Sequence, residues 1–167
     1  MFTCTKKFTG FPFAHRSPRH PGHCQFIHGH DWSFEFEFAC THRDPCGFVV
    51  DFGDLGWLKD WLSEQFDHTL VLSDSDPLLP VIRAQLTDVT HEGRGPVDLA
   101  RIVVVPDCGS EGLAEYLFAF ATGALKIRYD GRVFLRRVTV YEGAVNSASL
   151  TNININVKVE PTPTPHE

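Results

Sequence analysis

The feature that most constrains the fold is a regular alternation of aromatic and polar residues in the first third of the chain. The aromatic positions are Trp32, Phe34, Phe36 and Phe38, and the residues between them are Ser33, Glu35 and Glu37. Because residues two apart in a strand project to the same side, this run predicts a strand with one buried face. His28 and His30 share the parity of the aromatic residues. They are therefore predicted to lie on the apolar side at the start of the strand, unless a bulge at Gly29 intervenes.

The His28-Gly29-His30 segment is typical of half a metal site. Two imidazoles two residues apart project in parallel from a strand, and the glycine between them lets another group approach the backbone. His15 offers a third imidazole where the predicted strand 2–11 gives way to a proline-rich loop, and Cys24 precedes the histidine pair. Three imidazoles on a divalent ion leave a coordination position open, as in catalytic zinc sites. The plainer interpretation is that any one of the nine histidines is an ordinary surface or core residue.

Composition narrows the class of protein. A chain of 167 residues is expected to form one domain, and a net charge of −6 with a pI near 5.8 does not indicate a nucleic-acid partner. No apolar run has the length of a membrane span, and the N-terminus lacks the pattern of a secretion signal. Five cysteines without CxxC spacing disfavour both a disulfide framework and a thiolate zinc knuckle. We therefore expect a reduced, cytoplasmic protein with one functional thiol.

Later segments supply the remaining predicted elements. Apolar spacing predicts helices over about 54–66 and from Ser110, a plausible N-cap, to about 125. Two further strands are predicted over 132–142 and 149–159. Residues 73–100 form a long polar excursion with a short helical turn near 80–86, followed by a short apolar run at 101–105. The Pro/Thr tail, 161–167, is expected to be disordered.

Together these elements predict a single α+β domain over residues 1–160. Its core is a four-stranded antiparallel sheet with two helices on one face. The open edges of such a sheet favour pairing with another copy of the chain, so we expect a homo-oligomer.

Cys24 and the Asp67-His68 pair need a joint explanation with the histidines. A thiol becomes a base when a neighbouring cation lowers its pKa, and a carboxylate beside an imidazole supports proton transfer near neutral pH. Zinc that polarises a hydroxyl or carbonyl, together with these groups, suits isomerisation, elimination or retro-aldol cleavage. No HExxH segment indicates a protease. Considered alone, each of these has a plainer interpretation. Cys24 would then be a small buried residue, and Asp67-His68 a charge pair at the end of a helix.

Five segments, in this order, resemble the family of 6-pyruvoyl-tetrahydropterin and 6-carboxytetrahydropterin synthases over roughly residues 2–160. They are Phe13-Ala14-His15, Cys24 followed by His28-Gly29-His30, Val50-Asp51-Phe52, Phe66-Asp67-His68 and Val140-Tyr141-Glu142. The resemblance implies a tunnelling fold (T-fold), with trimeric rings stacked into hexamers.

The resemblance also implies roles for single residues. Zinc would be bound by His15, His28 and His30. Cys24 would be the general base, with Asp67 and His68 as proton-relay partners. Glu142 would anchor the pterin, and Ser110 and Glu111 would contribute to its binding. The sequence departs from the family at Cys108-Gly109, where a Pro-Thr pair is usual, at Gly143, where a threonine is usual, and in the long 73–100 excursion.

The short spacing between Cys24 and His28 resembles the bacterial 6-carboxy branch. That branch is a lyase that converts 7,8-dihydroneopterin triphosphate to 6-carboxy-5,6,7,8-tetrahydropterin, releasing acetaldehyde and triphosphate, in 7-deazaguanine (queuosine) biosynthesis. Three alternatives remain: a 6-pyruvoyl-tetrahydropterin synthase that eliminates triphosphate, a non-catalytic pterin- or purine-binding oligomer, and a three-histidine hydrolase, which would leave Cys24 without a task.

Overall fold

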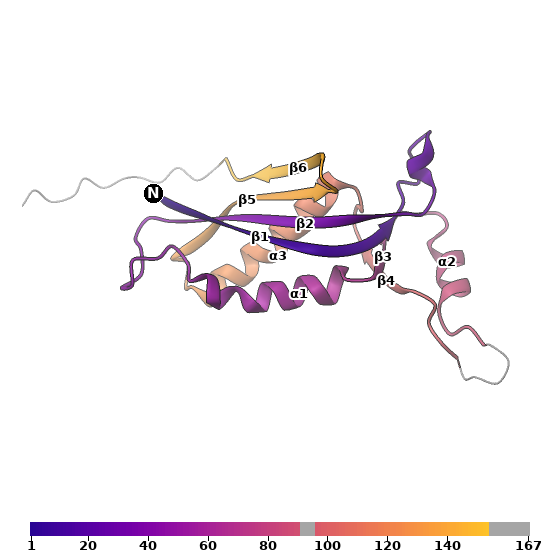
Figure 1. The fold of residues 1–167 in the computed structure, drawn as a ribbon, viewed down its shortest axis with the longest axis horizontal. Coiled ribbons are helices and arrows are strands. Elements are labelled where there is room, and N and C mark those ends of the chain that lie inside the picture. The colour runs from indigo at the N-terminus through magenta and orange to yellow at the C-terminus, as the bar shows by residue number, and fades with distance from the viewer. Residues whose placement is uncertain (91–95, 154–167) are drawn as a thin grey trace, which may run out of the picture.

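The aromatic alternation forms the middle of a long strand in the computed structural model, which describes residues 1–90 and 96–153. Within these residues six strands make one sheet in the order β4-β3-β1-β2-β5-β6 (Figure 1). The strands are β1 (Phe2–His15), β2 (His28–Cys40), β3 (Thr69–Ser73), β4 (Arg101–Val105), β5 (Val133–Glu142) and β6 (Asn146–Thr151).

The two longest strands, β1 and β2, form an antiparallel pair that sets the position of the histidines. Their register places His15 opposite His28 and Phe13 opposite His30. The register is regular at Gly29, so the bulge considered there does not occur, but it shifts between Thr9 and Phe11. Gly10, at φ +83°, is the extra residue, a conformation that glycine adopts without strain. This bulge returns Phe11, Phe13 and His15 to the buried face that Phe8 occupies.

The prediction of a four-stranded antiparallel sheet was wrong in number and direction. The four long antiparallel strands are present, but β3 pairs in parallel with β1, and β4 pairs in parallel with β3. All five residues of β3 are buried, which removes the alternation that reveals a half-exposed strand. The apolar run 101–105 forms β4 at the edge of the sheet.

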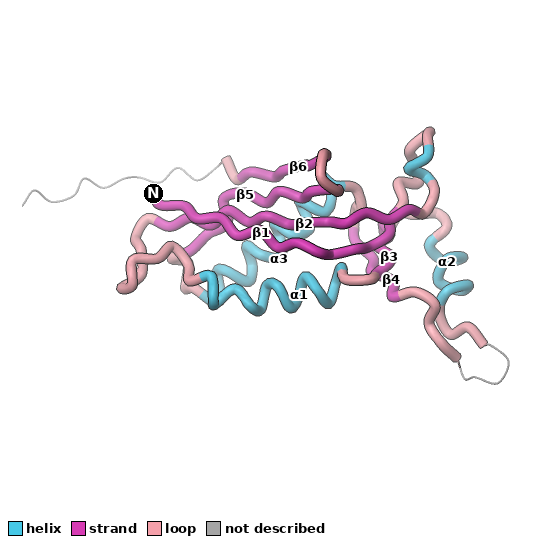
Figure 2. The backbone as a smooth tube through the Cα atoms, viewed as in Figure 1, coloured by secondary structure: helices cyan, strands magenta, loops and turns pink. Residues whose placement is uncertain are grey.

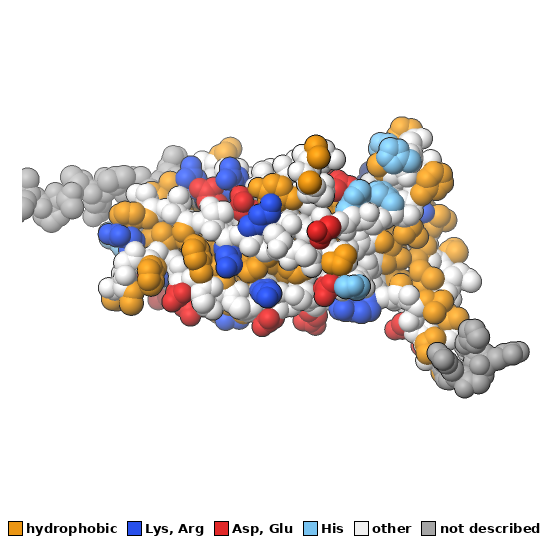
Figure 3. Space-filling model, viewed as in Figure 1, with side chains coloured by type: hydrophobic (Ala, Val, Ile, Leu, Met, Phe, Trp, Pro, Cys, Tyr) orange, Lys and Arg blue, Asp and Glu red, His pale blue; other side chains and the backbone are white. Residues whose placement is uncertain are grey.

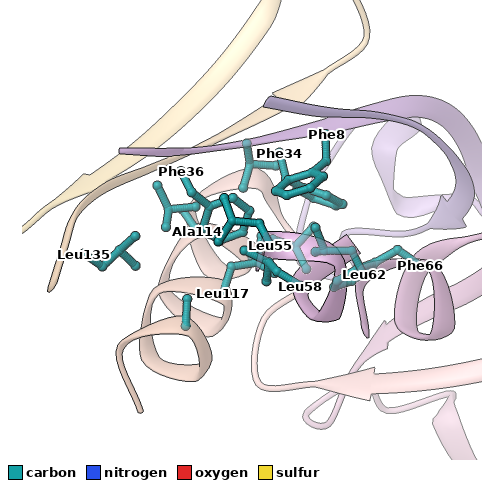
Figure 4. Packing of buried hydrophobic residues seen from close by; sticks show 14 of the residues in the cluster. Phe8, Phe34, Phe36, Leu55, Leu58, Leu62, Phe66, Ala114, Leu117 and Leu135 are labelled. Carbon is teal, nitrogen blue, oxygen red and sulfur yellow. The ribbon is translucent and has the colours of Figure 1, made fainter. Parts of the chain in front are cut away.

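Two helices cover one face of the sheet, as predicted (Figure 2). They are α1 (Gly56–Phe66), which follows a 3₁₀ turn η2 (Phe52–Leu55), and α3 (Ser110–Arg128). The aromatic residues of β2 pack against the apolar stripes of both helices, and Leu58, Leu62, Phe66 and Leu117 are completely buried (Figure 4). The N-cap of α3 is Gly109 and not Ser110. Ser110 is the first helical residue, and its hydroxyl donates to Glu142 and not to the helix backbone.

The 73–100 excursion contains a third helix, α2 (Leu79–Leu86), where a short helical turn was expected. This helix lies apart from α1 and α3, at the end of the molecule where β1 ends and a 3₁₀ turn, η1 (His23–Gln25), projects (Figure 1). None of its residues is fully buried. Among the described residues, no helix has both the length and the apolar character that a membrane span requires.

The last strand was predicted over 149–159, but β6 ends at Thr151. Residues 154–159 and the tail at 161–167 lie outside the described residues. Within the described part of the chain, β4 and β6 form the two edges of the sheet.

Candidate metal centre and active site

Three imidazoles converge where β1 ends and β2 begins. The ring centroids of His15 and His28 are 4.6 Å apart, those of His28 and His30 are 5.0 Å apart, and those of His15 and His30 are 5.6 Å apart. Trp32 closes the inner side, with its ring centroid 5.0 Å from that of His15. Figure 3 shows histidine side chains gathered at this end of the molecule. The structure thus brings together the three histidines that the sequence analysis selected as candidate metal ligands.

Backbone carbonyls orient two of the rings. The carbonyl of Cys108 lies 2.9 Å from Nδ1 of His15, and the carbonyl of Phe26 lies 2.8 Å from Nδ1 of His28. Because a carbonyl only accepts, each Nδ1 carries the hydrogen, and each neutral ring presents a lone pair at Nε2. Metal-binding histidines typically use this arrangement.

His15 is the most buried of the three histidines, with 3% of its surface exposed. Burial lowers its pKa, which keeps the imidazole neutral and able to act as a ligand. Its Nε2 atom is buried and has no hydrogen-bond partner among the residues that the structure describes. A bound cation is one way to satisfy such an atom, so the donor set fits a metal ion.

Glu142, the last residue of β5, completes this group. It pairs with Trp32 of β2, which places its carboxylate beside the histidines. Its Oε1 atom is 2.9 Å from Nε2 of His30 and 3.6 Å from Nε2 of His15. Ligand atoms around a tetrahedral zinc ion are about 3.3 Å apart, given zinc–nitrogen bonds of about 2.0–2.1 Å. One ligand atom from each of the four residues lies within 4.8 Å of the others, so the group could hold a metal ion.

A cavity of about 250 Å³ adjoins this group. It contains six of the nine predicted site residues, His15, Cys24, His28, Ser110, Glu111 and Glu142. The Ser110 hydroxyl donates to Oε2 of Glu142 at 3.1 Å, which fixes the side of the carboxylate that faces away from the histidines. The beginning of α3 and the end of β5 therefore form one wall of the cavity, and the loop after β1 forms the other.

Cys24 lies in η1, half-buried, and contributes to the same cavity as His15 and His28. It is not part of the four-residue group that could hold a metal. This position separates the thiol from the candidate ligands and leaves it facing the space where a substrate would lie. It suits a base and not a fourth ligand.

Asp67 and His68 lie elsewhere. Oδ1 of Asp67 is 2.6 Å from Nδ1 of His68, so the two side chains touch, although their adjacency in sequence did not require this. The His68 side chain is 80% exposed and lines a shallow depression that also includes Ala14, His30 and Asp31 and does not include Cys24. One chain alone does not bring this pair to Cys24.

The backbone of His68 also has an unusual conformation. Its φ angle is +55°, in the left-handed region that non-glycine residues rarely adopt. A hydrogen bond from its N–H to the carbonyl of Pro12, 2.9 Å long, holds it there. Such strain is found disproportionately at functional sites.

Sequence reasoning missed two neighbours of the site. His20 lines the cavity, and its Nδ1 accepts the N–H of Gly22 at 3.0 Å, so the neutral ring carries its hydrogen on Nε2 and can donate. Cys108 supplies the carbonyl that orients His15. His20 lies in a proline-rich loop without periodicity, and Cys108 acts through its backbone. The one signal in the sequence was at Cys108, where the chain departs from the family pattern. No signal was available for His20.

The comparisons with known proteins agree with this geometry. The family model described as 6-pyruvoyl tetrahydropterin synthase matches residues 3–152. Among curated relatives, the 6-carboxy-5,6,7,8-tetrahydropterin synthase of Rickettsia conorii is 40% identical over 77 residues, which cover 46% of this chain and 55% of that protein. The corresponding protein of Rickettsia bellii is also 40% identical over 77 residues, with the same coverage of both chains. The chain thus spans about half the length of these relatives.

Solved structures show the same fold. An uncharacterized protein from Wolinella succinogenes superimposes with a TM-score of 0.73 at 23% identity, covering 90% of this chain and 98% of that one. A catalytic-residue mutant of the 6-pyruvoyltetrahydropterin synthase of Plasmodium vivax gives a TM-score of 0.63 at 16% identity, covering 91% of this chain and 99% of that one. These identities support the fold alone, whereas the family model covers most of the sequence. The chain belongs to the 6-pyruvoyl tetrahydropterin synthase family.

Proposed function

We propose that the protein is a zinc-dependent 6-carboxy-5,6,7,8-tetrahydropterin synthase, a lyase acting on 7,8-dihydroneopterin triphosphate with release of acetaldehyde and triphosphate. The observation that carries the proposal is the placement of Cys24 in one cavity with His15, His28 and Glu142. A binding protein would not need a thiol at this position. The names of the Rickettsia relatives and the short spacing between Cys24 and His28 favour the 6-carboxy branch.

The metal ligands are His15, His28 and His30, each through Nε2. The carbonyls of Cys108 and Phe26 hold the first two rings in the required tautomer. A zinc ion bound there supplies a Lewis acid for the hydroxyls of the substrate side chain. Zinc is preferred over harder ions because imidazole nitrogen suits it, whereas magnesium and calcium prefer all-oxygen sites.

Cys24 removes a carbon-bound proton from the substrate. Its position in the cavity, outside the candidate ligand group, leaves its sulfur available for this step. Proton transfer by a positioned side chain typically contributes about 10² to 10⁴ in rate. His68, held by Asp67, exchanges a second proton.

Because His68 is exposed and lines a different depression from the Cys24 cavity, it serves the Cys24 cavity of a neighbouring copy in the oligomer. Association through the open edges β4 and β6 would bring the two surfaces together. The expected assembly is a hexamer of two trimers.

Glu142 anchors the pterin, because a carboxylate accepts a pair of charge-assisted hydrogen bonds from the guanidine-like N–H groups of the ring. Ser110 already donates to this carboxylate, and Glu111 lies beside it in the cavity wall. The other oxygen of the same carboxylate lies 2.9 Å from Nε2 of His30.

The product would enter 7-deazaguanine (queuosine-type) synthesis in the cytoplasm. The direct test is mass spectrometry of the products after zinc-loaded protein is incubated with 7,8-dihydroneopterin triphosphate. Carboxy pterin together with acetaldehyde is the expected result. Pyruvoyl pterin would identify the triphosphate-eliminating activity, and unchanged substrate bound to the protein would identify a non-catalytic pterin-binding oligomer.

A further inference from the structure

A buried ion pair involves Arg16, the residue that follows the candidate ligand His15. Nε of Arg16 is 3.2 Å from Oδ2 of Asp76, and the side chains are only 13% and 0% exposed. The other oxygen, Oδ1, accepts the N–H of Leu78 at 2.9 Å, at the entrance to α2. Arg16 follows His15 in the chain, so Asp76 holds the residue next to a candidate metal ligand.

Cys108 makes a second connection to the same two residues. Its carbonyl accepts from Nδ1 of His15 at 2.9 Å, and its thiol donates to the carbonyl of Arg16 at 3.0 Å. The segment that carries Asp76 is tied to the segment before Cys108, because Ser73 Oγ donates to the carbonyl of Pro106 at 2.8 Å. Asp76 and Cys108 therefore both contact Arg16, and Cys108 contacts His15 as well.

The connection continues to the thiol. Ser17 follows Arg16, and its N–H donates to the carbonyl of Cys24 at 2.7 Å. Of the two residues that flank Arg16, His15 thus belongs to the metal centre and Ser17 contacts the proposed base, Cys24. A shift of the Arg16 backbone would move both groups relative to each other.

This pair is an expensive way to stabilise a fold. Removing two charges from water carries a desolvation cost that a packed apolar pair avoids, and such replacements are often neutral or stabilising. Helix α2, which Asp76 introduces, has no fully buried residue and adds little to the core. The segment 73–78 therefore has a clearer part in fixing Arg16 than in packing.

We propose that Asp76 is a positioning residue for the metal centre, which acts through Arg16 and, together with Cys108, fixes the His15 imidazole and the loop that carries Cys24. This role gives the excursion after β3 a function. The inference rests on the proposed function insofar as His15 is a metal ligand.

The test uses the full chain with Co²⁺ as the metal probe, read by its visible absorption spectrum and by direct titration. We expect Asp76→Asn to weaken Co²⁺ binding about tenfold or more, the range for residues that orient metal ligands, and to change the absorption spectrum. Asp74→Asn is the matched control, since Asp74 lies two residues away and is exposed, and it should leave both readings unchanged.

A second variant separates positioning from stability, because Asp76→Asn destabilises the fold by leaving Arg16 without its partner charge. In Arg16→Met/Asp76→Leu both charges are replaced by apolar side chains. We expect its melting temperature to return towards that of the wild type, while Co²⁺ affinity stays low and the spectrum stays altered. If the double variant recovers wild-type affinity and spectrum, or if folded Asp76→Asn binds Co²⁺ like the wild type, the inference is wrong. If the wild type itself binds no Co²⁺, the proposed metal centre is wrong, and this inference falls with it.

Discussion

The carboxylate of Glu142 lies 2.9 Å from Nε2 of His30, although the two residues are far apart in the sequence. The pairing of Trp32 with Glu142 between β2 and β5 creates this contact. The same oxygen faces the lone pair of His15 Nε2 at 3.6 Å, an arrangement that is unfavourable unless a positive charge lies between them. The local geometry therefore favours a cation at this point.

Glu142→Gln is expected to lower Co²⁺ affinity about tenfold, because the substitution removes a negative charge beside three imidazoles and keeps the size of the side chain. The measurement is titration of the metal-free protein by visible absorption. Glu111→Gln is the control, since Glu111 lies in the same cavity wall but outside the four-residue group. His28→Ala should lose most of the bound metal. It shows how large the loss of affinity is when a ligand is removed, for comparison with Glu142→Gln. Equal affinity in Glu142→Gln and Glu111→Gln would show that the carboxylate does not contribute to the metal centre.

The metal half of the site was predictable because its information is local. His28 and His30 lie on one face of a strand whose parity is set by four aromatic residues, and the structure keeps that parity. The position of Glu142 beside them depends on strand pairing across more than a hundred residues, which no periodicity records. His15 lies on the buried face only because of the bulge at Gly10. In the sequence, the imperfect alternation of the first strand was the one sign of this bulge.

One error in the predicted fold has a clear physical cause. β3 is short and buried along its whole length, so its apolar run carries no period that distinguishes a strand from the end of a helix. In β5 a register shift opposite Glu37 places Arg136 and Arg137 side by side. This shift interrupts the alternation of buried and exposed residues in the strand. The strand was nevertheless predicted over nearly its true length. Continuous burial therefore left β3 without a sequence pattern that predicts a strand, whereas a single interruption did not prevent the prediction of β5.

Cys24→Ala is expected to keep its metal and lose product formation by at least about 10²-fold, since a positioned base typically contributes that much. Metal content is measured by plasma emission spectrometry and product by mass spectrometry. Cys46→Ala, at an exposed cysteine, should keep both. Loss of metal together with activity in Cys24→Ala would identify the thiol as a ligand.

His68 offers a test of the shared site, because its exposed side chain does not line the cavity that contains Cys24. We expect Cys24→Ala and His68→Ala to be inactive as separate proteins. When the two are unfolded together and refolded as a mixture, some sites would combine an intact Cys24 from one copy with an intact His68 from another. Activity should return to roughly a quarter of the wild-type value, an estimate that assumes random mixing of copies within closed rings. A mixture as inactive as its components would mean that both groups must come from the same chain.

The stability of the metal-free protein should fall as the pH drops below the ordinary histidine value of 6.5, because of His15. Burial lowers the pKa of His15 in the folded state, so on acidification the unfolded chain takes up a proton that the folded chain resists. The contribution of His15 is fully present above pH 6.5 and is lost as the pH falls towards the folded value. Urea unfolding with a chelator present, repeated at several pH values between 7.5 and 5.5, measures the effect.

His15→Asn isolates this contribution, since its amide can still donate to the carbonyl of Cys108 but does not titrate. Its free energy of unfolding should change less with pH than that of the wild type. If His15→Asn and the wild type lose stability equally between pH 7.5 and 5.5, then His15 does not titrate differently in the folded and unfolded states, and the buried neutral imidazole that the metal centre requires is not present.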